Sequence, residues 1–299
     1  YGRAGRVHER LLLRGDLGRG DRERAQHAIA LDCLTAGLLD RAELALQRLE
    51  GTPFEAEARL ALLAIYERSS DWSLAAAIAD KMDRAAQGDF STRPAHYLCE
   101  QAATLLGKGQ TEEARSLLQR AIATAPHAAR ARIDLAAMQQ ASGDHAAAFS
   151  TLRTMGEATP AALPLAAARL AQAASSSQQP QAALDLLTSS YATSPSLDVL
   201  DAIVALTASG TGDNEQARTW YVKHLEREPS LVAAAKWIAG EKLEHAQFHP
   251  QIQRALDHAV KPLTRYRCAA CGFEAKQHFW QCPGCQTWDS YPARRVEEL

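Results

Sequence analysis

The 299-residue sequence has little excess of charge, few aromatic residues and no long apolar run. Its 33 basic and 35 acidic residues leave a formal net charge of -2, so no overall field draws the chain to nucleic acid or to acidic lipid. No stretch approaches the roughly 18 consecutive apolar residues of a membrane-spanning helix. With 46% hydrophobic and 23% charged residues, the chain as given is predicted to be soluble and able to bury a core.

The sequence also lacks the common signatures of catalytic sites. It contains no Walker loop, no H-E-x-x-H, no G-x-S-x-G and no protein-kinase motif set. No G-x-G-x-x-G indicates a flavin or nicotinamide fold. We therefore predict that the protein is not an enzyme and has no catalytic residues.

Cysteine is scarce as well, with six residues in the whole chain and no secretory signal, which favours a reducing compartment. Cys33 and Cys99 stand alone in apolar helical stretches and are expected to act as small hydrophobic residues. The other four form two C-x2-C pairs ten residues apart, a spacing typical of a tetrahedral metal site. The predicted metal ligands are Cys268, Cys271, Cys282 and Cys285.

Each cysteine pair carries the residues that a tight turn around an ion needs. Pro283 and Gly284 lie inside the second pair and Gly272 follows the first; proline fixes one backbone angle and glycine permits a positive φ. Four thiolates leave no open position for water, so we expect a structural site and not a catalytic one. We predict zinc. Iron is the alternative, because the spacing of the cysteines alone does not separate the two metals.

Upstream of the cysteines, small residues recur at nearly even intervals, and each is followed five residues later by an alanine. The six pairs are Gly37 with Ala42, Ser70 with Ala75, Gly109 with Ala114, Gly143 with Ala148, Ser177 with Ala182, and Gly212 with Ala217. Successive alanines lie 33, 39, 34, 34 and 35 residues apart, close to the 34-residue period of the tetratricopeptide repeat. The small residue makes the turn between two helices and the alanine lets them approach closely. An irregular alanine-rich helical bundle is the alternative.

These patterns predict an all-α fold, a tetratricopeptide-repeat superhelix followed by a small rubredoxin-like or zinc-ribbon β module. The expected divisions are repeats over 1–229, capping helices over 230–263 (helices near 231–246 and 250–260), and the metal-binding module over 264–299. The long step between Ala75 and Ala114 indicates an enlarged loop over 87–94, and the serine-rich stretch 175–180 indicates a looser turn. The module is short, so we expect its large aromatic rings, Trp280 or Trp288, to lean on the last helices.

The first repeat is incomplete, because Arg3-Ala4 aligns with Arg41-Ala42 and no helix precedes it. We therefore expect this sequence to be a piece of a longer protein with a further N-terminal segment.

The segments YRCAACGF at 266–273 and WQCPGC at 280–285, together with the repeats, resemble the lipopolysaccharide assembly protein B family. The stretch AGLLDRAE at 36–43 is a further similarity. The resemblance implies the same four cysteine ligands and an N-terminal transmembrane helix that anchors the full-length protein in the inner membrane of Gram-negative bacteria, with the repeats and the metal module on the cytoplasmic side. Gln286 departs from the glycine that follows the last cysteine in rubredoxin.

The resemblance also implies a function without catalysis. Members act as adaptors that bring the UDP-3-O-acyl-N-acetylglucosamine deacetylase of lipid A synthesis to the membrane protease FtsH, which limits lipopolysaccharide synthesis. A general assembly scaffold or co-chaperone for lipopolysaccharide-synthesis enzymes is the alternative. A third possibility, nucleic-acid binding by the tail, rests on five basic residues: Arg265, Arg267, Lys276, Arg294 and Arg295. We expect no nucleic-acid partner, since the chain as a whole is not basic.

Overall fold

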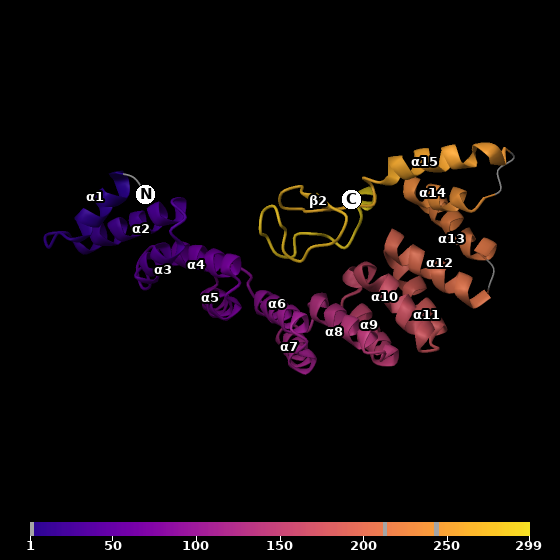
Figure 1. The fold of residues 1–299 in the computed structure, drawn as a ribbon, viewed down its shortest axis with the longest axis horizontal. Helices are drawn as coiled ribbons and strands as arrows, with labels where there is room; N and C mark the ends of the chain where they lie inside the picture. Colours follow the sequence, from indigo (N-terminus) through magenta and orange to yellow (C-terminus); the bar gives the residue numbers. More distant parts are fainter. Residues whose placement is uncertain (1–2, 212–213, 242–244) are drawn as a thin grey trace. The chain divides into compact units, whose positions relative to one another are not determined.

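A computed structural model describes residues 3–211, 214–241 and 245–299, and α-helices occupy most of these ranges (Figure 1). The helices are α1 (Arg3–Leu12), α2 (Arg19–Thr35), α3 (Leu39–Gln47), α4 (Glu55–Ser69), α5 (Trp72–Arg84), α6 (Arg93–Gly107), α7 (Thr111–Thr124), α8 (Ala129–Ala141), α9 (His145–Ala158), α10 (Leu163–Ser176), α11 (Pro180–Thr193), α12 (Leu197–Thr211), α13 (Asn214–Arg227), α14 (Leu231–Ala239) and α15 (His249–Val260). The chain divides into two compact units, residues 1–125 and 126–299. The first contains α1 to α7, and the second contains α8 to α15 and the C-terminal module.

In both units, consecutive helices pack against one another as helix-turn-helix pairs. In five of these pairs, the second helix begins two residues after a residue with left-handed backbone, φ between 59° and 83°. These residues are Gly37, Ser70, Gly109, Gly143 and Gln178. Five residues after each of them is an alanine with 0% exposure, so the turn and the close helix contact recur in one fixed register: Ala42, Ala75, Ala114, Ala148 and Ala183. The predicted repeat fold is confirmed.

The register of the fifth turn differs by one residue from the prediction. Gln178 has the left-handed backbone there, and Ser177, the predicted turn residue, has a φ of -98°. Accordingly, Ala183 is fully buried while Ala182 is only partly buried. The expected looser turn is also wrong, because only residues 177–179 separate α10 from α11, as 142–144 separate α8 from α9. Of the sixth pair, Gly212 lies outside the described residues, and Ala217 is fully buried.

The enlarged loop predicted for residues 87–94 is present, since residues 85–92 connect α5 to α6. The loop is held by its own side chains. Phe90 is 7% exposed, its backbone N–H donates to the Asp83 carboxylate at 3.3 Å, and the Arg93 guanidinium lies 5.0 Å from the centre of its ring. The extra residues therefore form an ordered loop beside the repeat.

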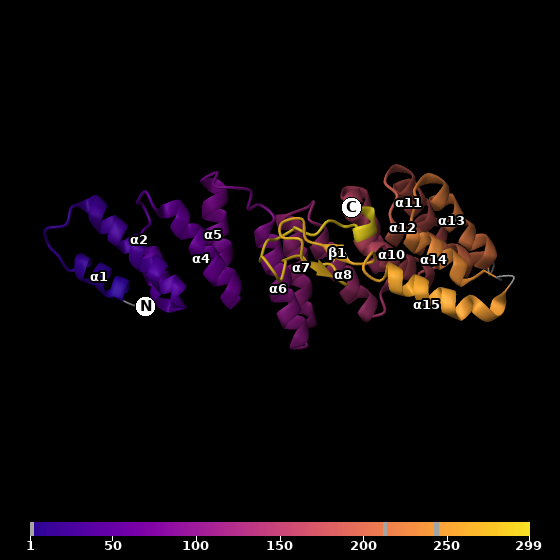
Figure 2. The same cartoon turned by 90° about the horizontal axis from the view of Figure 1, so that it is seen from above.

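After the repeats, α14 and α15 continue the helical stack of the second unit. The first of these helices ends at Ala239, seven residues before the predicted end, and a short 3₁₀ turn at Ala246–Phe248 precedes α15. No helix in the described ranges is long and apolar enough to cross a membrane. The last 36 residues contain two short antiparallel strands, β1 (Tyr266–Arg267), labelled in Figure 2, and β2 (Glu274–Ala275), labelled in Figure 1, and end in a 3₁₀ turn at Val296–Glu298.

Candidate metal centre

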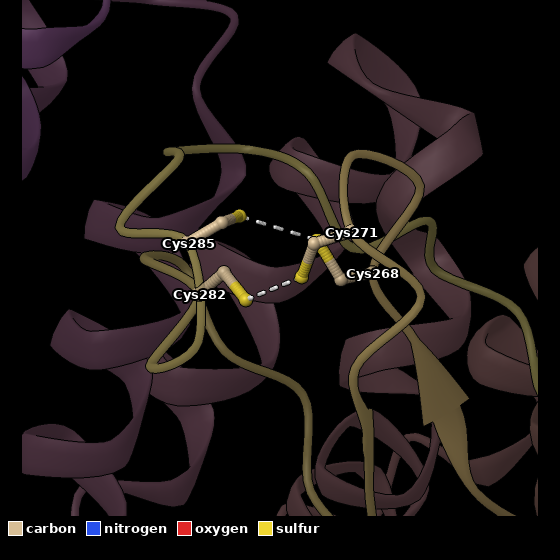
Figure 3. Close-up of side chains that lie close together, drawn as sticks. All are labelled: Cys268, Cys271, Cys282 and Cys285. Atoms are coloured by element: carbon tan, nitrogen blue, oxygen red, sulfur yellow. Dashed lines mark hydrogen bonds between the residues drawn. The ribbon is translucent and has the colours of Figure 1, made fainter.

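Four cysteine sulfurs lie together in the C-terminal module (Figure 3). All four Sγ atoms are within 4.8 Å of one another; Cys268 Sγ is 3.8 Å from Cys285 Sγ, and Cys271 Sγ is 3.7 Å from Cys282 Sγ. These distances are far too long for a disulfide bond of about 2.05 Å. Four sulfurs bound tetrahedrally to one ion at about 2.3 Å would lie roughly 3.8 Å apart. The donor set therefore fits a single tetrahedral metal ion.

The two cysteine pairs have the same backbone turn. Gly272 donates its N–H to the carbonyl of Cys268 at 2.9 Å, and Gln286 donates its N–H to the carbonyl of Cys282 at 2.8 Å. Both donors have left-handed backbone, with φ of 77° and 61°. The residue after each pair thus makes the turn, and the positive φ falls on Gln286 and not on Gly284, where the sequence suggested it. Left-handed backbone costs about 1–2 kcal/mol in a non-glycine residue, so the second turn holds some strain.

Hydrogen bonds and burial act in opposite directions on the sulfur atoms. Burial disfavours the Cys268 thiolate, but hydrogen bonds with Ser290 and with the backbone of Cys271 and Ala270 lower the pKa of Cys268 to about 6. The Phe273 backbone favours the thiolate of Cys271, yet desolvation and the neighbouring sulfurs raise the pKa of Cys271 to about 12. Without a cation, the cluster therefore keeps protons; a bound metal ion would stabilise all four sulfurs as thiolates.

Aromatic rings make up most of the remaining core of the module. Tyr266 and Tyr291 are buried beside the sulfurs, and the Tyr291 hydroxyl donates to the carbonyl of Phe273 at 3.1 Å. The His278 ring lies between Tyr266 and Trp280, with ring centres 5.6 and 4.7 Å away, and burial lowers the pKa of His278. Its Nε2 is 3.0 Å from the Tyr291 carbonyl oxygen. This core is small, so the sulfur cluster is a large part of what organises the module.

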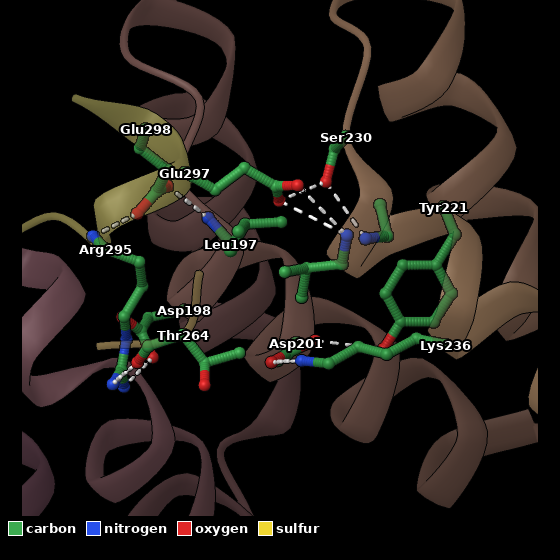
Figure 4. Close-up of polar contacts among 12 residues, drawn as sticks. Leu197, Asp198, Asp201, Tyr221, Ser230, Lys236, Thr264, Arg295, Glu297 and Glu298 are labelled. Atoms are coloured by element: carbon green, nitrogen blue, oxygen red, sulfur yellow. Dashed lines mark hydrogen bonds and ion pairs between the residues drawn. The ribbon is translucent and has the colours of Figure 1, made fainter. Parts of the chain in front are cut away.

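The module is attached to the helices by its last residues, and Glu297 makes the first of these contacts (Figure 4). The Glu297 carboxylate accepts hydrogen bonds from the Ser230 hydroxyl at 2.7 Å and from the N–H groups of Leu231 at 2.7 Å and Val232 at 3.2 Å. Those groups form the N-terminus of α14, where backbone N–H groups lack partners within the helix and the helix dipole is positive. A carboxylate 65 residues away in sequence from Val232 therefore caps this helix.

Glu298 and Arg295 attach the module to α12 in the same way. Glu298 accepts the N–H of Leu197, the first residue of α12, at 2.7 Å. Arg295 makes two hydrogen bonds, at 2.8 and 2.7 Å, to the carboxylate of Asp198 in the first turn of α12. The Arg295 guanidinium also lies 4.1 Å from the centre of the Tyr266 ring. Arg295 thus connects the core of the module to the helix, and the paired, planar geometry is the strongest form of such a contact.

Trp280 packs against the helical core of the second unit, so the module leans on the helices as expected, and a contact of this ring with the last helices stays a prediction. Trp288 is buried within the module and pairs with Gln281 in an isolated bridge. Sequence reasoning missed Glu297 and Glu298, because nothing local indicates a partner that lies 65 or more residues away. The serine before α14 was the only visible signal of a helix start.

The basic residues of the tail are mostly engaged within the protein, which removes much of the support for nucleic-acid binding. Arg265 and Arg267 pair with Glu274, Arg294 donates to Ser194, and Arg295 pairs with Asp198.

Two family models match the chain. Residues 266–291 match the rubredoxin metal binding domain, which covers all four cysteines, and residues 105–173 match the tetratricopeptide repeat. Both parts of the predicted architecture are therefore found in the comparisons, and the four-cysteine cluster lies in a segment that matches a metal-binding domain.

Curated relatives match almost the entire chain. The chain is 26% identical to lipopolysaccharide assembly protein B of Escherichia coli (strain K12), over 99% of this chain and 78% of that protein. It is 24% identical to the protein of the same name from Haemophilus influenzae, over 96% of this chain and 74% of that protein. Among solved structures, the C-terminal part of a TPR repeat-containing protein from Cytophaga hutchinsonii matches with a TM-score of 0.41 and 15% identity, covering 78% of this chain and 92% of that chain.

Proposed function

Because the chain is a homologue of proteins named lipopolysaccharide assembly protein B along nearly its whole length, we propose that it is a non-catalytic adaptor in the control of lipopolysaccharide synthesis. The proposal is supported by the repeat fold, since stacked helix pairs present an extended surface that holds other proteins. An adaptor acts by raising the local concentration of one bound protein near another, which needs no reactive side chain.

In the finer form of this proposal, the partners are the membrane protease FtsH and the UDP-3-O-acyl-N-acetylglucosamine deacetylase of lipid A synthesis. The adaptor presents the deacetylase to the protease and so limits how much lipid A precursor is made. It acts at the cytoplasmic face of the inner membrane, held there by an N-terminal helix that is outside this sequence. Nucleic acid is not a partner.

We also propose that Cys268, Cys271, Cys282 and Cys285 bind one structural zinc ion. The supporting observation is the separation of the paired sulfurs, 3.7 and 3.8 Å, together with the match to a metal-binding domain. Zinc supplies a fixed tetrahedral centre without redox change, and iron remains the second candidate metal. The protein residues then hold the two turns and attach the folded module to α12 and α14.

The experiment that tests the adaptor role measures the cellular abundance of the deacetylase. The full-length protein is depleted in its own organism and then restored either intact or with all four cysteines changed to serine. We expect deacetylase abundance to rise on depletion and to return to normal only with the intact protein. A matched control restores the protein with Cys33→Ala and Cys99→Ala, which leaves the metal site whole. Unchanged abundance on depletion would contradict the proteolytic role.

The second candidate is a general assembly scaffold or co-chaperone for the enzymes of lipopolysaccharide synthesis. It is favoured by the name of the relatives, which refers to assembly and not to proteolysis. In that case depletion leaves deacetylase abundance unchanged, and crosslinking of the intact protein captures several enzymes of the pathway.

A further inference from the structure

A cleft of about 350 Å³ lies where the metal module meets the helices. It is bordered by the first two turns of α12 and α14, by the segment after α15, by the residue that follows β2 and by Arg295 of the tail. Clefts of roughly 300–1,000 Å³ are the usual size of small-ligand sites, and they occur preferentially where two structural parts meet. The charges around this cleft indicate what it could hold.

Every carboxylate near the cleft already has a positive partner. Asp198 is paired with Arg295, and Asp201 is paired with Lys236 while it also accepts the Tyr221 hydroxyl at 2.9 Å (Figure 4). The carboxylates of Glu298 and Glu297 accept hydrogen bonds from the N–H groups at the positive N-termini of α12 and α14. The two carboxylates that line the cleft are therefore each paired with a cationic side chain.

Two lysines on the cleft have no partner among the residues that the structure describes. Within the described residues, the ammonium groups of Lys261 and Lys276 make no hydrogen bond or ion pair, and both side chains are exposed. Lys261 follows α15, and Lys276 follows β2, so the helices contribute one surplus charge and the module contributes the other. The side chains that line the cleft therefore carry four positive and two negative charges, and the two charges in excess come from its two sides.

We propose that this cleft binds a phosphate group, held between Lys261 of the helical part and Lys276 of the metal module. A phosphate monoester carries close to two negative charges at neutral pH, which matches the surplus, and lysine ammonium groups are established ligands of phosphate. A ligand held from both sides also favours the attached arrangement of the module, since anything that binds only that arrangement stabilises it. The phosphate belongs either to a soluble small molecule or to a lipid headgroup. This inference is independent of the adaptor role.

The test uses the zinc-loaded chain and inorganic pyrophosphate, with calorimetric titration at low ionic strength. We expect binding to the unchanged protein, and Lys261→Met and Lys276→Met each to weaken it by roughly tenfold or more, as loss of a charge-assisted hydrogen bond does. Lys108→Met removes the same charge from an exposed lysine after α6 and is the matched control. Arginine at both cleft positions retains the charges and should retain binding.

A second arm distinguishes the two sources of the phosphate. Cosedimentation with phosphatidylcholine vesicles, with and without phosphatidic acid, should show Lys261- and Lys276-dependent binding only if a lipid headgroup can enter the cleft. Pyrophosphate binding without vesicle binding assigns the site to soluble ligands. The proposal is overturned if neither probe binds, if all three methionine variants bind equally, or if an oligoglutamate peptide binds through these lysines in preference to pyrophosphate.

Discussion

The helices of residues 126–260 and the module of residues 264–299 are stabilised in different ways, although they belong to one compact unit. The helices share a continuous apolar core that includes Phe149, Leu163 and Leu200, each at most 1% exposed. In the module the buried cluster consists of two tyrosines and two cysteines. A chain of 36 residues buries too little apolar surface to fold by that means alone. The module is therefore stabilised mainly by its sulfur cluster and by its contacts with the neighbouring helices. The helical region is stabilised by the packing of each repeat against the next.

Loss of one sulfur should separate the two regions most clearly. In Cys282→Ser we expect the metal to be lost and the module to unfold, because metal binding supplies on the order of 10 kcal/mol to domains of this kind. Most of the helical circular dichroism should remain, since each repeat is stabilised by its neighbours. Elemental analysis of bound metal and the NMR signals of Tyr266 and Tyr291 report the result, with Cys99→Ala as the control. Unchanged metal content would contradict the assignment of the ligands.

A larger side chain at one buried alanine should lower the stability of the helical region and leave the module folded. Ala183 is fully buried between two helices, so Ala183→Leu is expected to destabilise the helices of residues 126–260 by about 1–3 kcal/mol. Ala182→Leu, at a partly buried site one residue earlier, should cost clearly less. Urea unfolding followed by circular dichroism measures both. Equal losses in the two variants would show that the fifth turn does not have the register described above.

Cutting the contact between the regions should have an intermediate effect. Glu297→Ala removes the carboxylate that caps α14 and is expected to cost about 1–2 kcal/mol. Hydrogen exchange at the amides of Leu231 and Val232 should become faster. Limited proteolysis should cleave the chain between the helices and the module more rapidly. Glu226→Ala, at an exposed site in α13, is the control. Unaltered exchange at both amides would mean that the cap contributes nothing to α14.

Acid should weaken both regions, because His224 is buried in the helices and His278 is partly buried in the module. Burial lowers the pKa of His224 in α13, whose ring contacts the Tyr191 hydroxyl at 2.6 Å, and of His278 in the module. The unfolded chain binds the proton more readily, so stability is full above about pH 6.5 and falls as the pH decreases below it. Each group contributes at most about 1.4 kcal/mol per pH unit. Thermal unfolding from pH 7.5 to 5.5 should show this decline, and His224→Gln should reduce it; an identical decline in that variant would exclude His224 as a cause.

The smallest expected effect concerns the two equivalent turns of the module, one with glycine and one with glutamine in the left-handed position. Gln286 and Gly272 occupy equivalent left-handed positions, so Gln286→Gly should relieve strain and stabilise the metal-loaded module by about 0.5–1 kcal/mol. Gly272→Gln should have the opposite sign. The temperature at which the loaded module releases its metal measures both variants. A loss of stability in Gln286→Gly would show that the glutamine side chain, which donates to the Pro283 carbonyl at 3.2 Å, matters more than the backbone strain.

Sequence patterns predicted the features that depend on residues close together along the chain. The spacing of the cysteine pairs was enough to indicate one metal site, because two intervening residues bring both sulfurs of a pair to one side of a turn. The recurring small residue and alanine were enough to indicate paired helices, and the enlarged loop before α6 followed from one irregular interval. The misassigned fifth turn had the same origin, since serine and glutamine are neighbours there and neither is glycine.

The attachment of the module was decided by tertiary structure alone. Glu297 and Glu298 are two ordinary acidic residues in the sequence, and they acquire partners only because folding brings the N-termini of α14 and α12 beside them. The surplus charge of Lys261 and Lys276 likewise exists only once Arg295 and Lys236 have been assigned to their carboxylates. Sequence by itself determined the repeat period and which four cysteines come together, since both depend on spacing along the chain. Tertiary structure decided which charges are compensated, because electrostatic pairing depends on distance in space and not along the chain.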